Sequence, residues 1–353
     1  MFDTKYNQEA FADLPGVTFS VIRQMVLGHA KLAKLKVLED VEQSLTVETQ
    51  HGLIGIRAGH STSVSAMVAA NNERWLFIMK TAVVEQLRQV MPTVADAMRW
   101  SNGPAEGTLP LNFIFVRVIS VVPLGSVFLR VMLEGDDLSS YGDDAIHFRL
   151  LQPSQDGQPL WPTVAANGST VWPDGEGALH KPVYTARSIN YSTNTLECDV
   201  FIHDGGRTSD WAQLVLSDNG SHQIVGLVGP LGGGILNTDK VLMASDETGF
   251  PAVARLLENL SPNVKGQLFL EADDGAACEY PFTIPVGIEV VWLARKAHEK
   301  LADAVLTAMP HHSDSKIWFA GEREQARRVR DAAKATGHDA KDLRISGFWS
   351  ANS

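Results

Sequence analysis

The pattern of hydrophobic and polar positions divides the chain into three stretches with different periods. In the first stretch, VIRQMVLGHAKL places Val21, Met25 and Leu32 at helical spacing. SLTVETQ and GLIGIRAG, joined by a short His-Gly turn, predict a β-hairpin, and STSVSAMVAA with RWLFIMK predicts a second one. TAVVEQLRQVMPTVADAMRW predicts an amphipathic helix that is interrupted near Pro92. Residues 1–102 are therefore expected to form a compact α+β module.

The second stretch, residues 103–236, follows the Gly- and Pro-rich joint SNGPAEGTLP and is rich in short β-type runs. These runs are FIFVRVISVV, VFLRVML, HFRLLQP, LECDVFIH and QIVGLVG, and no long helix separates them. Such spacing predicts an antiparallel barrel or sandwich. The longest apolar tract is interrupted by Arg117, Pro123 and Arg130, so it predicts two strands and no membrane insertion.

The third stretch, residues 237–353, alternates strand patterns with helix patterns. The strands are KVLMAS, GQLFLEA, IEVVWLAR, KIWFAG and DLRISGFW, and the helices are PAVARLLENL, HEKLADAVLTAM and EREQARRVRDAAKATG. This alternation predicts an α/β domain with a parallel sheet covered on both faces. Ligands bind such sheets at the carboxyl ends of the strands.

Composition and charge narrow the classes of function. The net charge is -11 and the acidic excess lies entirely in the second and third stretches, so nucleic acid is not an expected partner. Cys198 and Cys278 are too few for a disulfide framework or a metal cluster, and His29, His51 and His60 lack metal-ligand spacing, so no metal site is expected. The start MFDTKYNQEAF has acids where a secretory signal has bases, which favours a cytoplasmic location.

One run, HDGGRTSDWAQLVLSDNGSHQIVGLVGPLGGG, combines turn residues with a helix start. Its Gly-Gly pair allows a turn, and Thr208 to Ala212 predict the beginning of a short helix whose free N–H groups favour a diphosphate. Ser209 can cap that helix or donate a hydrogen bond, and Trp211 offers an apolar wall. The glycines from Gly229 to Gly234 predict either a hinge or a close approach of the backbone to a ligand.

Two acidic groups follow predicted strands of the third stretch. Asp246, Glu247 and Thr248 are typical of a helix N-terminal cap. A turn that lines a ligand pocket is the alternative interpretation of these residues. A second group, Glu271, Asp273 and Asp274, ends a strand where a dinucleotide fold meets the adenosine ribose, and acids there favour a 2′-hydroxyl and hence NADH. Arg295 and Arg323 are alternative receivers of the 2′-phosphate of NADPH, so both nucleotides remain candidates.

Several short motifs follow one another along the second and third stretches. They are Tyr184-Thr185-x-Arg187, His203, Ser209-x-Trp211-Ala212, Gly229-Pro230-x-Gly232, Ser245-Asp246-Glu247-Thr248 and Trp318-x-Ala320-Gly321-Glu322. Taken together and in this order, they resemble the siderophore-interacting protein family, whose members are FAD-dependent ferric-siderophore reductases of the ferredoxin-NADP reductase superfamily. The resemblance runs from about Leu111 to the end of the chain, and the first module is similar to a DUF2218 domain.

The resemblance implies a FAD-binding β-barrel over residues 103–236, followed by an NAD(P)H-binding α/β domain over residues 237–353. It implies that Tyr184 packs on the flavin, that Thr185 hydrogen-bonds its polar edge and that Arg187 complements the diphosphate. No catalytic protein residue is expected, because the cofactor carries the chemistry. The implied cofactor-binding residues are Tyr184, Thr185, Arg187, His203, Thr208, Ser209, Trp211, Ala212, Asp246, Glu247, Thr248, Gly321 and Glu322.

Two positions depart from the family pattern. Pro182 stands two residues before the tyrosine, where family members carry arginine, and Ser350 replaces an arginine near the C-terminus. Lys181 and Arg187 are alternative sources of the missing charge. The structural alternative for Tyr184 and Trp211 is that both are core aromatics, and for His203 that it is a surface or capping histidine.

The expected function is therefore the transfer of electrons from NAD(P)H through FAD to siderophore-bound Fe³⁺, which releases Fe²⁺. The expected partners are a ferric siderophore and a second copy of the chain in a homodimer. Two alternatives stay open: a general NAD(P)H flavin oxidoreductase with another acceptor, and a non-catalytic siderophore-binding protein.

Overall fold

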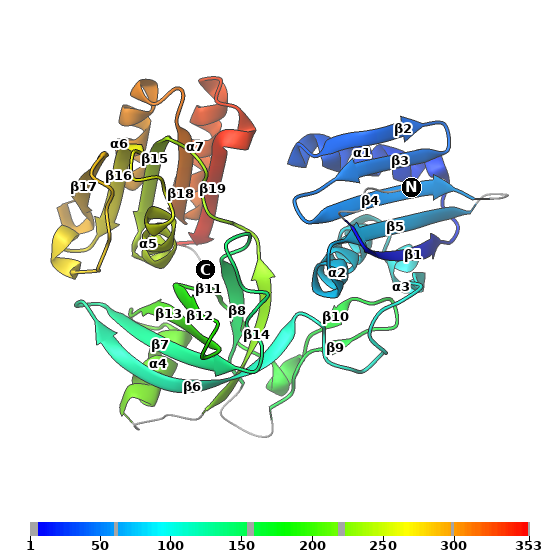
Figure 1. Ribbon diagram of the computed structural model, residues 1–353, viewed down its shortest axis with the longest axis horizontal. Coiled ribbons are helices and arrows are strands. Elements are labelled where there is room, and N and C mark those ends of the chain that lie inside the picture. The colour runs from blue at the N-terminus through cyan, green and yellow to red at the C-terminus, as the bar shows by residue number, and fades with distance from the viewer. Residues whose placement is uncertain (1–5, 60–62, 154–158, 218–222, 298–299, 352–353) are drawn as a thin grey trace. The chain divides into compact units, whose positions relative to one another are not determined.

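The computed structural model describes residues 6–59, 63–153, 159–217, 223–297 and 300–351. The chain divides into two compact units (Figure 1). The first combines residues 1–113 with residues 153–179, and the second combines residues 114–152 with residues 180–353. His60, which the sequence excluded as a metal ligand, lies outside the described residues, as do residues 298–299 at the start of a predicted helix.

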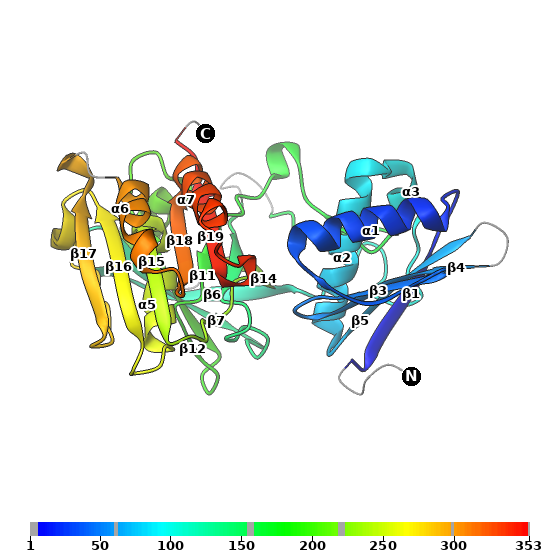
Figure 2. The same ribbon diagram turned by 90° about the horizontal axis from the view of Figure 1, so that it is seen from above.

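The first unit is built on a five-stranded antiparallel sheet in the order β1-β5-β4-β3-β2 (Figure 1), and Figure 2 shows α1 lying over this sheet. Helices α1 and α2 pack on one face of it, where Ile22 and Val84 share a core with Val47 and Ile56. The elements are β1 (Gln8–Leu14), α1 (Phe19–Ala33), β2 (Lys36–Val41), β3 (Ser44–Glu48), β4 (Gly52–Ala58), β5 (Val64–Ala70), α2 (Glu73–Val90), α3 (Pro92–Ala97), β9 (Thr163–Val164) and β10 (Thr170–Val171).

The second predicted hairpin of this unit is wrong. RWLFIMK is not a strand; it forms the first half of α2 and continues without a break into TAVVEQLRQV. The Asn72 side chain accepts a hydrogen bond from the Trp75 backbone N–H at 2.9 Å, so the Asn-Asn-Glu sequence is a helix N-cap and not a hairpin turn. The predicted interruption near Pro92 is confirmed, because α2 ends at Val90 and α3 begins at Pro92.

Residues 153–179 leave the β-barrel sequence and belong to the first unit. We call them the excursion. Strand β9 is held by two backbone bonds, from the Gly107 N–H to the Val164 oxygen at 2.8 Å and from the Val164 N–H to the Thr108 oxygen at 2.9 Å. Asn167 is buried and donates to the Ala95 oxygen at 3.0 Å. The sequence assigned these residues to the barrel because they lie between two of its β-type runs, HFRLLQP and LECDVFIH.

The second unit begins with a seven-stranded antiparallel sheet in the order β11-β8-β14-β6-β7-β13-β12. It encloses an apolar core to which the short helix α4 contributes Ala212 and Val215. This confirms the predicted antiparallel barrel and the helix expected at Thr208 to Ala212. The elements are β6 (Phe113–Leu124), β7 (Phe128–Gly135), β8 (His147–Leu151), β11 (Val183–Thr185), β12 (Ser188–Asn190), β13 (Thr195–Phe201), α4 (Arg207–Ser217) and β14 (Ile224–Leu231).

A five-stranded parallel sheet in the order β17-β16-β15-β18-β19 completes the unit (Figure 1). Alternate residues of β15 enter two cores: Val241 and Met243 pack with α5, and Leu242 and Ala244 pack with α6 and α7. Both faces are therefore covered, as predicted. The elements are β15 (Lys240–Asp246), α5 (Phe250–Glu258), β16 (Lys265–Ala272), β17 (Ile288–Ala294), α6 (Leu301–Ala308), β18 (Lys316–Glu322), α7 (Arg323–Ala335) and β19 (Leu343–Trp349).

Among the described helices, none combines the length and the apolar composition that crossing a membrane requires.

Candidate flavin and nucleotide site

A cavity of about 460 Å³ opens where the barrel meets the carboxyl ends of the parallel strands. Barrel strands β8, β11 and β13 form one side of it, and the turn after β15 and the end of β19 form the other. Its lining residues are His147, Pro182, Val183, Tyr184, Thr185, Asp199, Phe201, His203, Glu247, Thr248, Pro251, Ser346, Gly347 and Phe348.

Five of the residues implied by the resemblance line this cavity: Tyr184, Thr185, His203, Glu247 and Thr248. Thr208 does not line it, but it is close enough to Tyr184 to act on the pKa of the tyrosine hydroxyl. Burial raises the pKa of Tyr184 above its ordinary value, so its hydroxyl stays protonated at neutral pH.

His147 is a site residue that the sequence did not indicate. It pairs with Thr185 across strands β8 and β11, and its Nδ1 lies 3.2 Å from the Thr185 hydroxyl. Burial first, and then the Arg255 cation, lower the pKa of His147 to about 4, so the ring is neutral at pH 7. The Phe348 ring meets it edge to face at 5.8 Å. No local motif marks His147, because only the pairing register brings it to Thr185.

Glycine makes room for this histidine. Gly233 has a φ of +85°, and a Cβ at that position would lie 3.0 Å from the imidazole Cδ2. Gly234 passes even closer to the chain, since a Cβ there would lie 2.7 Å from the Asp143 oxygen. The expected close approach of the backbone in Gly229 to Gly234 is therefore present, and it is an approach to protein atoms of the barrel.

The loop before α4 is held by Ser209. Its hydroxyl accepts a hydrogen bond from the His203 N–H at 3.2 Å and donates to the Phe201 oxygen at 3.3 Å. Gly206 can carry no side chain, because a Cβ there would lie 2.7 Å from the Ser209 hydroxyl and 2.8 Å from the His203 ring. Ser209 therefore fixes the turn that presents the start of α4.

Three of the implied cofactor residues have protein partners outside the cavity. Trp211 packs against the barrel core and donates its Nε1 hydrogen to Gln223 at 2.9 Å, and Ala212 is buried in that core. Arg187 pairs with Glu258 of α5, at 2.8 Å from its Nη1 to Oε2. The structure therefore favours a packing role for Trp211 and Ala212. Arg187 binds Glu258 through Nη1 and Nη2 only, and its buried Nε has no hydrogen-bond partner among the described residues, so a diphosphate role for Arg187 stays open.

Asp246 is the centre of the turn after β15. Its carboxylate accepts from the Thr248 N–H at 3.0 Å, the Thr248 hydroxyl at 2.5 Å and the Trp349 indole N–H at 2.7 Å. Burial, partly offset by these bonds, raises the pKa of Asp246 to about 6. Gly321 leaves space for it, since a Cβ there would lie 2.9 Å from Oδ2. The helix-cap interpretation of this turn thus holds, and the turn also faces the cavity.

Glu322 has a capping role as well. Its side chain accepts hydrogen bonds from the Glu324 N–H at 2.6 Å and the Gln325 N–H at 3.0 Å, so it is the N-cap of α7. Neither Gly321 nor Glu322 lines the cavity.

The carboxyl edge of the parallel sheet carries an ion-pair network that we call the sheet-edge cluster. Arg295 donates from Nε to Glu271 at 3.0 Å, from Nη1 to Asp273 at 2.5 Å and from Nη2 to Glu247. Glu247 and Glu271 are buried, and Glu271 also accepts from the Leu301 N–H at 2.9 Å. Two of the three acids that were expected to meet a ribose, Glu271 and Asp273, are thus tied to Arg295, which with Arg323 was an alternative receiver of a 2′-phosphate. The third acid, Asp274, pairs with Lys296 at 2.8 Å. A smaller cavity of about 290 Å³ lies beside this cluster.

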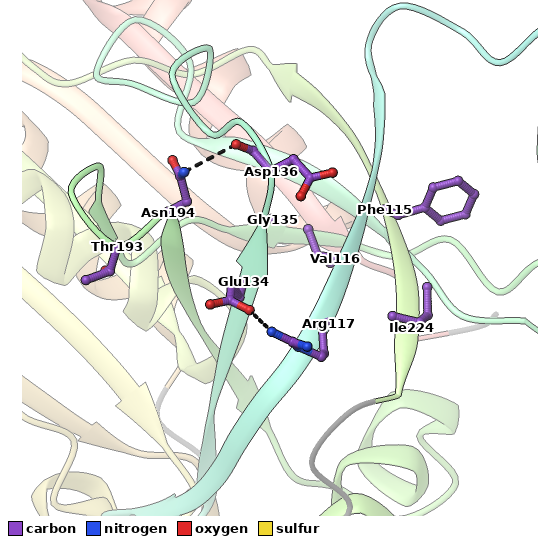
Figure 3. A pocket seen from close by; sticks show the side chains of 9 residues that line it. All are labelled: Phe115, Val116, Arg117, Glu134, Gly135, Asp136, Thr193, Asn194 and Ile224. Atoms are coloured by element: carbon purple, nitrogen blue, oxygen red, sulfur yellow. Dashed lines mark hydrogen bonds and ion pairs between the residues drawn. The ribbon is translucent and has the colours of Figure 1, made fainter.

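A further cavity of about 450 Å³ lies elsewhere on the barrel, between β6, β7 and the turn before β13 (Figure 3). Arg117 pairs with Glu134 across it, and Asn194 donates to the Asp136 oxygen at 3.2 Å. Its polar groups satisfy one another, so they indicate no ligand.

Comparison with known proteins agrees with this geometry. Residues 117–233 match the model of the siderophore-interacting FAD-binding domain, and residues 238–352 match that of the siderophore-interacting protein. The NADPH-dependent ferric-chelate reductase of Escherichia coli is 30% identical over 252 residues, covering 68% of this chain and 94% of that protein. Ferric vibriobactin reductase ViuB of Vibrio cholerae is 32% identical over 209 residues, covering 56% of this chain and 73% of that protein.

Solved structures give the same fold. A siderophore utilization protein from T. fusca matches with a TM-score of 0.56 and 25% identity, covering 70% of this chain and 97% of that one. The siderophore-interacting protein SipS from Aeromonas hydrophila matches with a TM-score of 0.55 and 18% identity, covering 68% of this chain and 98% of that one. A FAD-binding antiparallel barrel followed by a nucleotide-binding parallel sheet defines a flavin-dependent reductase fold. Within that class, the chain belongs to the siderophore-interacting protein family.

The residues present fit FAD. Tyr184 offers an aromatic ring on the wall of a cavity between the two halves, and the start of α4 offers free N–H groups beside it. Gln152 supports the same conclusion, because its buried Nε2 donor has no hydrogen-bond partner among the described residues although it lies next to Thr208. A bound acceptor group there would satisfy that donor.

Proposed function

We propose that this protein is an NAD(P)H-dependent, FAD-containing reductase of ferric siderophores. The observation that carries the proposal is the cavity itself, in which the Tyr184–Thr185 strand faces the turn at Glu247 and Thr248 across the junction of barrel and sheet. The names of the relatives from E. coli and V. cholerae, a ferric-chelate reductase and a ferric vibriobactin reductase, support the same reaction.

The chemistry that FAD supplies when bound is acceptance of a hydride from NAD(P)H and donation of single electrons to siderophore-bound Fe³⁺. The product Fe²⁺ binds the hard oxygen ligands of a siderophore less strongly, so reduction releases it. The role of the chain's own residues is to bind the flavin and to orient it. Tyr184 packs against the flavin ring, Thr185 hydrogen-bonds its polar edge, and His147 holds the Thr185 hydroxyl in place.

The turn after β15 is the place for the nicotinamide in this proposal. Glu247 and Thr248 reach the cavity from the sheet, and Asp246 keeps the turn rigid through its three hydrogen bonds. Phe348 and Pro251 close the cavity on the same side and limit the access of water.

An anaerobic visible spectrum of the purified protein tests the proposal. A flavin spectrum should bleach on addition of NADH or NADPH and return when a ferric siderophore such as ferric enterobactin is added. A protein that binds no added FAD would refute it. Reoxidation by a quinone but not by the ferric complex would support a general flavin oxidoreductase instead, and siderophore binding without nucleotide oxidation would support a binding protein.

Three further expectations belong to the same proposal. The limits 1–102, 103–236 and 237–353, with a DUF2218-like first module, are our assignment of domains. A cytoplasmic location is consistent with intracellular NAD(P)H as the electron donor. A homodimer is our expectation for the assembly, and light scattering of the purified protein tests it directly.

A further inference from the structure

The two ends of the excursion meet beside the start of α4. Gln152, the last residue before it, and His180, the first after it, exchange backbone hydrogen bonds of 2.8 and 3.1 Å. Their side chains converge on Thr208, whose hydroxyl donates to Gln152 Oε1 at 3.3 Å and lies 3.1 Å from His180 Nε2. We call Gln152, His180, Arg207 and Thr208 the junction cluster.

The junction cluster contains a buried donor that nothing in the protein satisfies. The Gln152 side chain is 5% exposed, and its Nε2 has no hydrogen-bond partner within the described residues. Leaving such a group unpaired costs about 1–3 kcal/mol. Thr208 fixes the other end of the amide, so Nε2 is held beside the first turn of α4, where backbone N–H groups are also free.

Arg207 adds a positive charge at the same place. It is the first residue of α4, it is exposed, and within the described part of the chain its guanidinium has no ion pair or hydrogen bond. It lies near enough to His180 to lower, after burial, the pKa of that histidine. The cluster therefore gathers an amide donor, a guanidinium and a helix N-terminus, and the acids of the same stretch are Asp204 before α4 and Asp210 in its first turn.

Donors of this kind on one side of a helix start fit a diphosphate. In the proposed function the flavin ring lies against Tyr184, which is close enough to Thr208 for the threonine hydroxyl to act on its pKa. Pro182 supplies no charge from the strand itself, and the other cations near that strand are Lys181 and Arg187, which pairs with Glu258 through its Nη atoms. Arg207 differs from both because it stands at the start of α4, next to the Thr208 that orients the unpaired Gln152 donor.

We propose that Arg207 and Gln152, oriented by Thr208 and His180, bind the diphosphate of FAD in this protein. The inference rests on the proposed function only as far as FAD is the cofactor. In this inference the diphosphate is bound by residues at the start of α4 and just after β8. The flavin ring is bound by the strand that carries Tyr184.

The test compares ligands that differ in their phosphates. Dissociation constants of flavin-free protein are measured by flavin fluorescence for FAD and for riboflavin, which lacks the diphosphate. Arg207→Gln should weaken FAD binding about tenfold and leave riboflavin binding unchanged, as expected for the loss of one charge-assisted contact. The matched control is Arg117→Gln, an exposed arginine of the same barrel that pairs with Glu134, and its FAD affinity should equal that of the wild type.

A second variant separates binding from folding. Gln152→Met removes the unpaired donor with little change in shape, so the flavin-free protein should unfold at the same or a higher urea concentration while FAD binding weakens by about fivefold. Equal loss of FAD and riboflavin binding in Arg207→Gln, or unchanged FAD binding in both variants, would overturn the inference and leave the proposed function intact. A wild-type protein that binds no FAD would refute both.

Discussion

The polar groups on the sheet side and on the barrel side differ in whether they have hydrogen-bond or ion-pair partners within the protein. On the sheet side, Arg295 binds three carboxylates, and Asp246 accepts three hydrogen bonds. On the barrel side, the Gln152 amide keeps an unpaired donor and Arg207 has no counter-ion among the described residues. The sheet edge is complete without a ligand, whereas the barrel side is not.

This difference suits the two ligands that the proposed reaction needs. A cofactor that stays bound can be part of the folded structure, so unpaired donors on the barrel side are satisfied for as long as it is present. A nucleotide that must leave after each turnover is better served by a surface that is stable when empty. The variants below test this contrast, beginning with the largest expected effect.

Removing the central cation should collapse the sheet-edge cluster. Arg295→Met leaves the buried carboxylates of Glu247 and Glu271 without a counter-charge, so the free energy of unfolding should fall by about 3 kcal/mol, less than for a fully buried pair because Arg295 is 35% exposed. Urea denaturation followed by circular dichroism measures the loss. The control is Arg327→Met, whose pairs with Glu324 and Asp331 are exposed and whose loss should leave the free energy of unfolding unchanged within error. Similar losses in both variants would contradict a self-sufficient sheet edge.

The two sides should also respond to acid in opposite directions. The pKa of His147 is lowered from 6.5 to about 4, so its contribution to stability is present above pH 6.5 and is lost as the pH falls towards 4. The pKa of Asp246 is raised from 3.8 to about 6, so its contribution is present below pH 3.8 and is lost as the pH rises through 6. Between pH 4 and 6 the two effects oppose each other.

Single substitutions of His147 and of Asp246 separate the two pH-dependent contributions to stability. In flavin-free protein, His147→Asn should become more stable relative to the wild type as the pH falls from 6 to 4, and Asp246→Asn should become less stable, each by about 2 to 3 kcal/mol across the window. The readout is the difference in urea midpoint between variant and wild type at each pH. Parallel curves for variant and wild type would show that neither group titrates in this window.

The aromatic wall on the barrel side should contribute mainly to cofactor retention. Tyr184→Ala removes the ring from the cavity and should weaken FAD binding by about thirtyfold, equivalent to about 2 kcal/mol. Tyr184→Phe is the matched control, since it keeps the ring and loses only the contact with Thr208. Absorbance of retained flavin after dialysis measures both. Full retention by the alanine variant would exclude stacking of Tyr184 on the flavin.

The smallest effect is expected at the C-terminal strand. Trp349→Phe removes the 2.7 Å bond to Asp246, and the free energy of unfolding should fall by about 1 kcal/mol at pH 7. The same substitution in an Asp246→Asn background should cost less, and the difference gives the coupling of the pair. No difference between the two backgrounds would mean that the bond does not stabilise the protein.

The parallel sheet was predicted well from the sequence because, in each of its segments, the spacing of apolar residues and the length of the segment indicated the same type of element. Apolar runs of strand length alternate with longer amphipathic segments, and this pattern has few alternatives. RWLFIMK was misassigned since a short apolar run is ambiguous by periodicity alone, and the decision depended on whether Asn72 caps a helix. Only a three-dimensional contact, the bond to Trp75, resolves it.

For the site, motif order located Tyr184, Thr185 and the turn at Glu247. It did not locate His147, which lines the cavity, or Gln152 and His180, to which we assign a role in binding the diphosphate. His147 is placed by the pairing of β8 with β11, and Gln152 and His180 by an isolated bridge next to it. Those strands are separated in the sequence by the excursion, so no local spacing reports their contact. Pairing partners of a recognised strand are thus the first place to look for site residues that motifs miss.

The excursion also changes what can be treated as a separable part of this protein. Its buried Asn167 and Ser169 form hydrogen bonds with Ala95 and Arg88 of the N-terminal sequence, while the residues that flank it, Gln152 and His180, lie next to barrel strands β8 and β11. A gene shortened to residues 103–353 would encode the excursion without the surface that buries it. The N-terminal module is therefore not an independent part that recombination can add or remove at a single point in the gene.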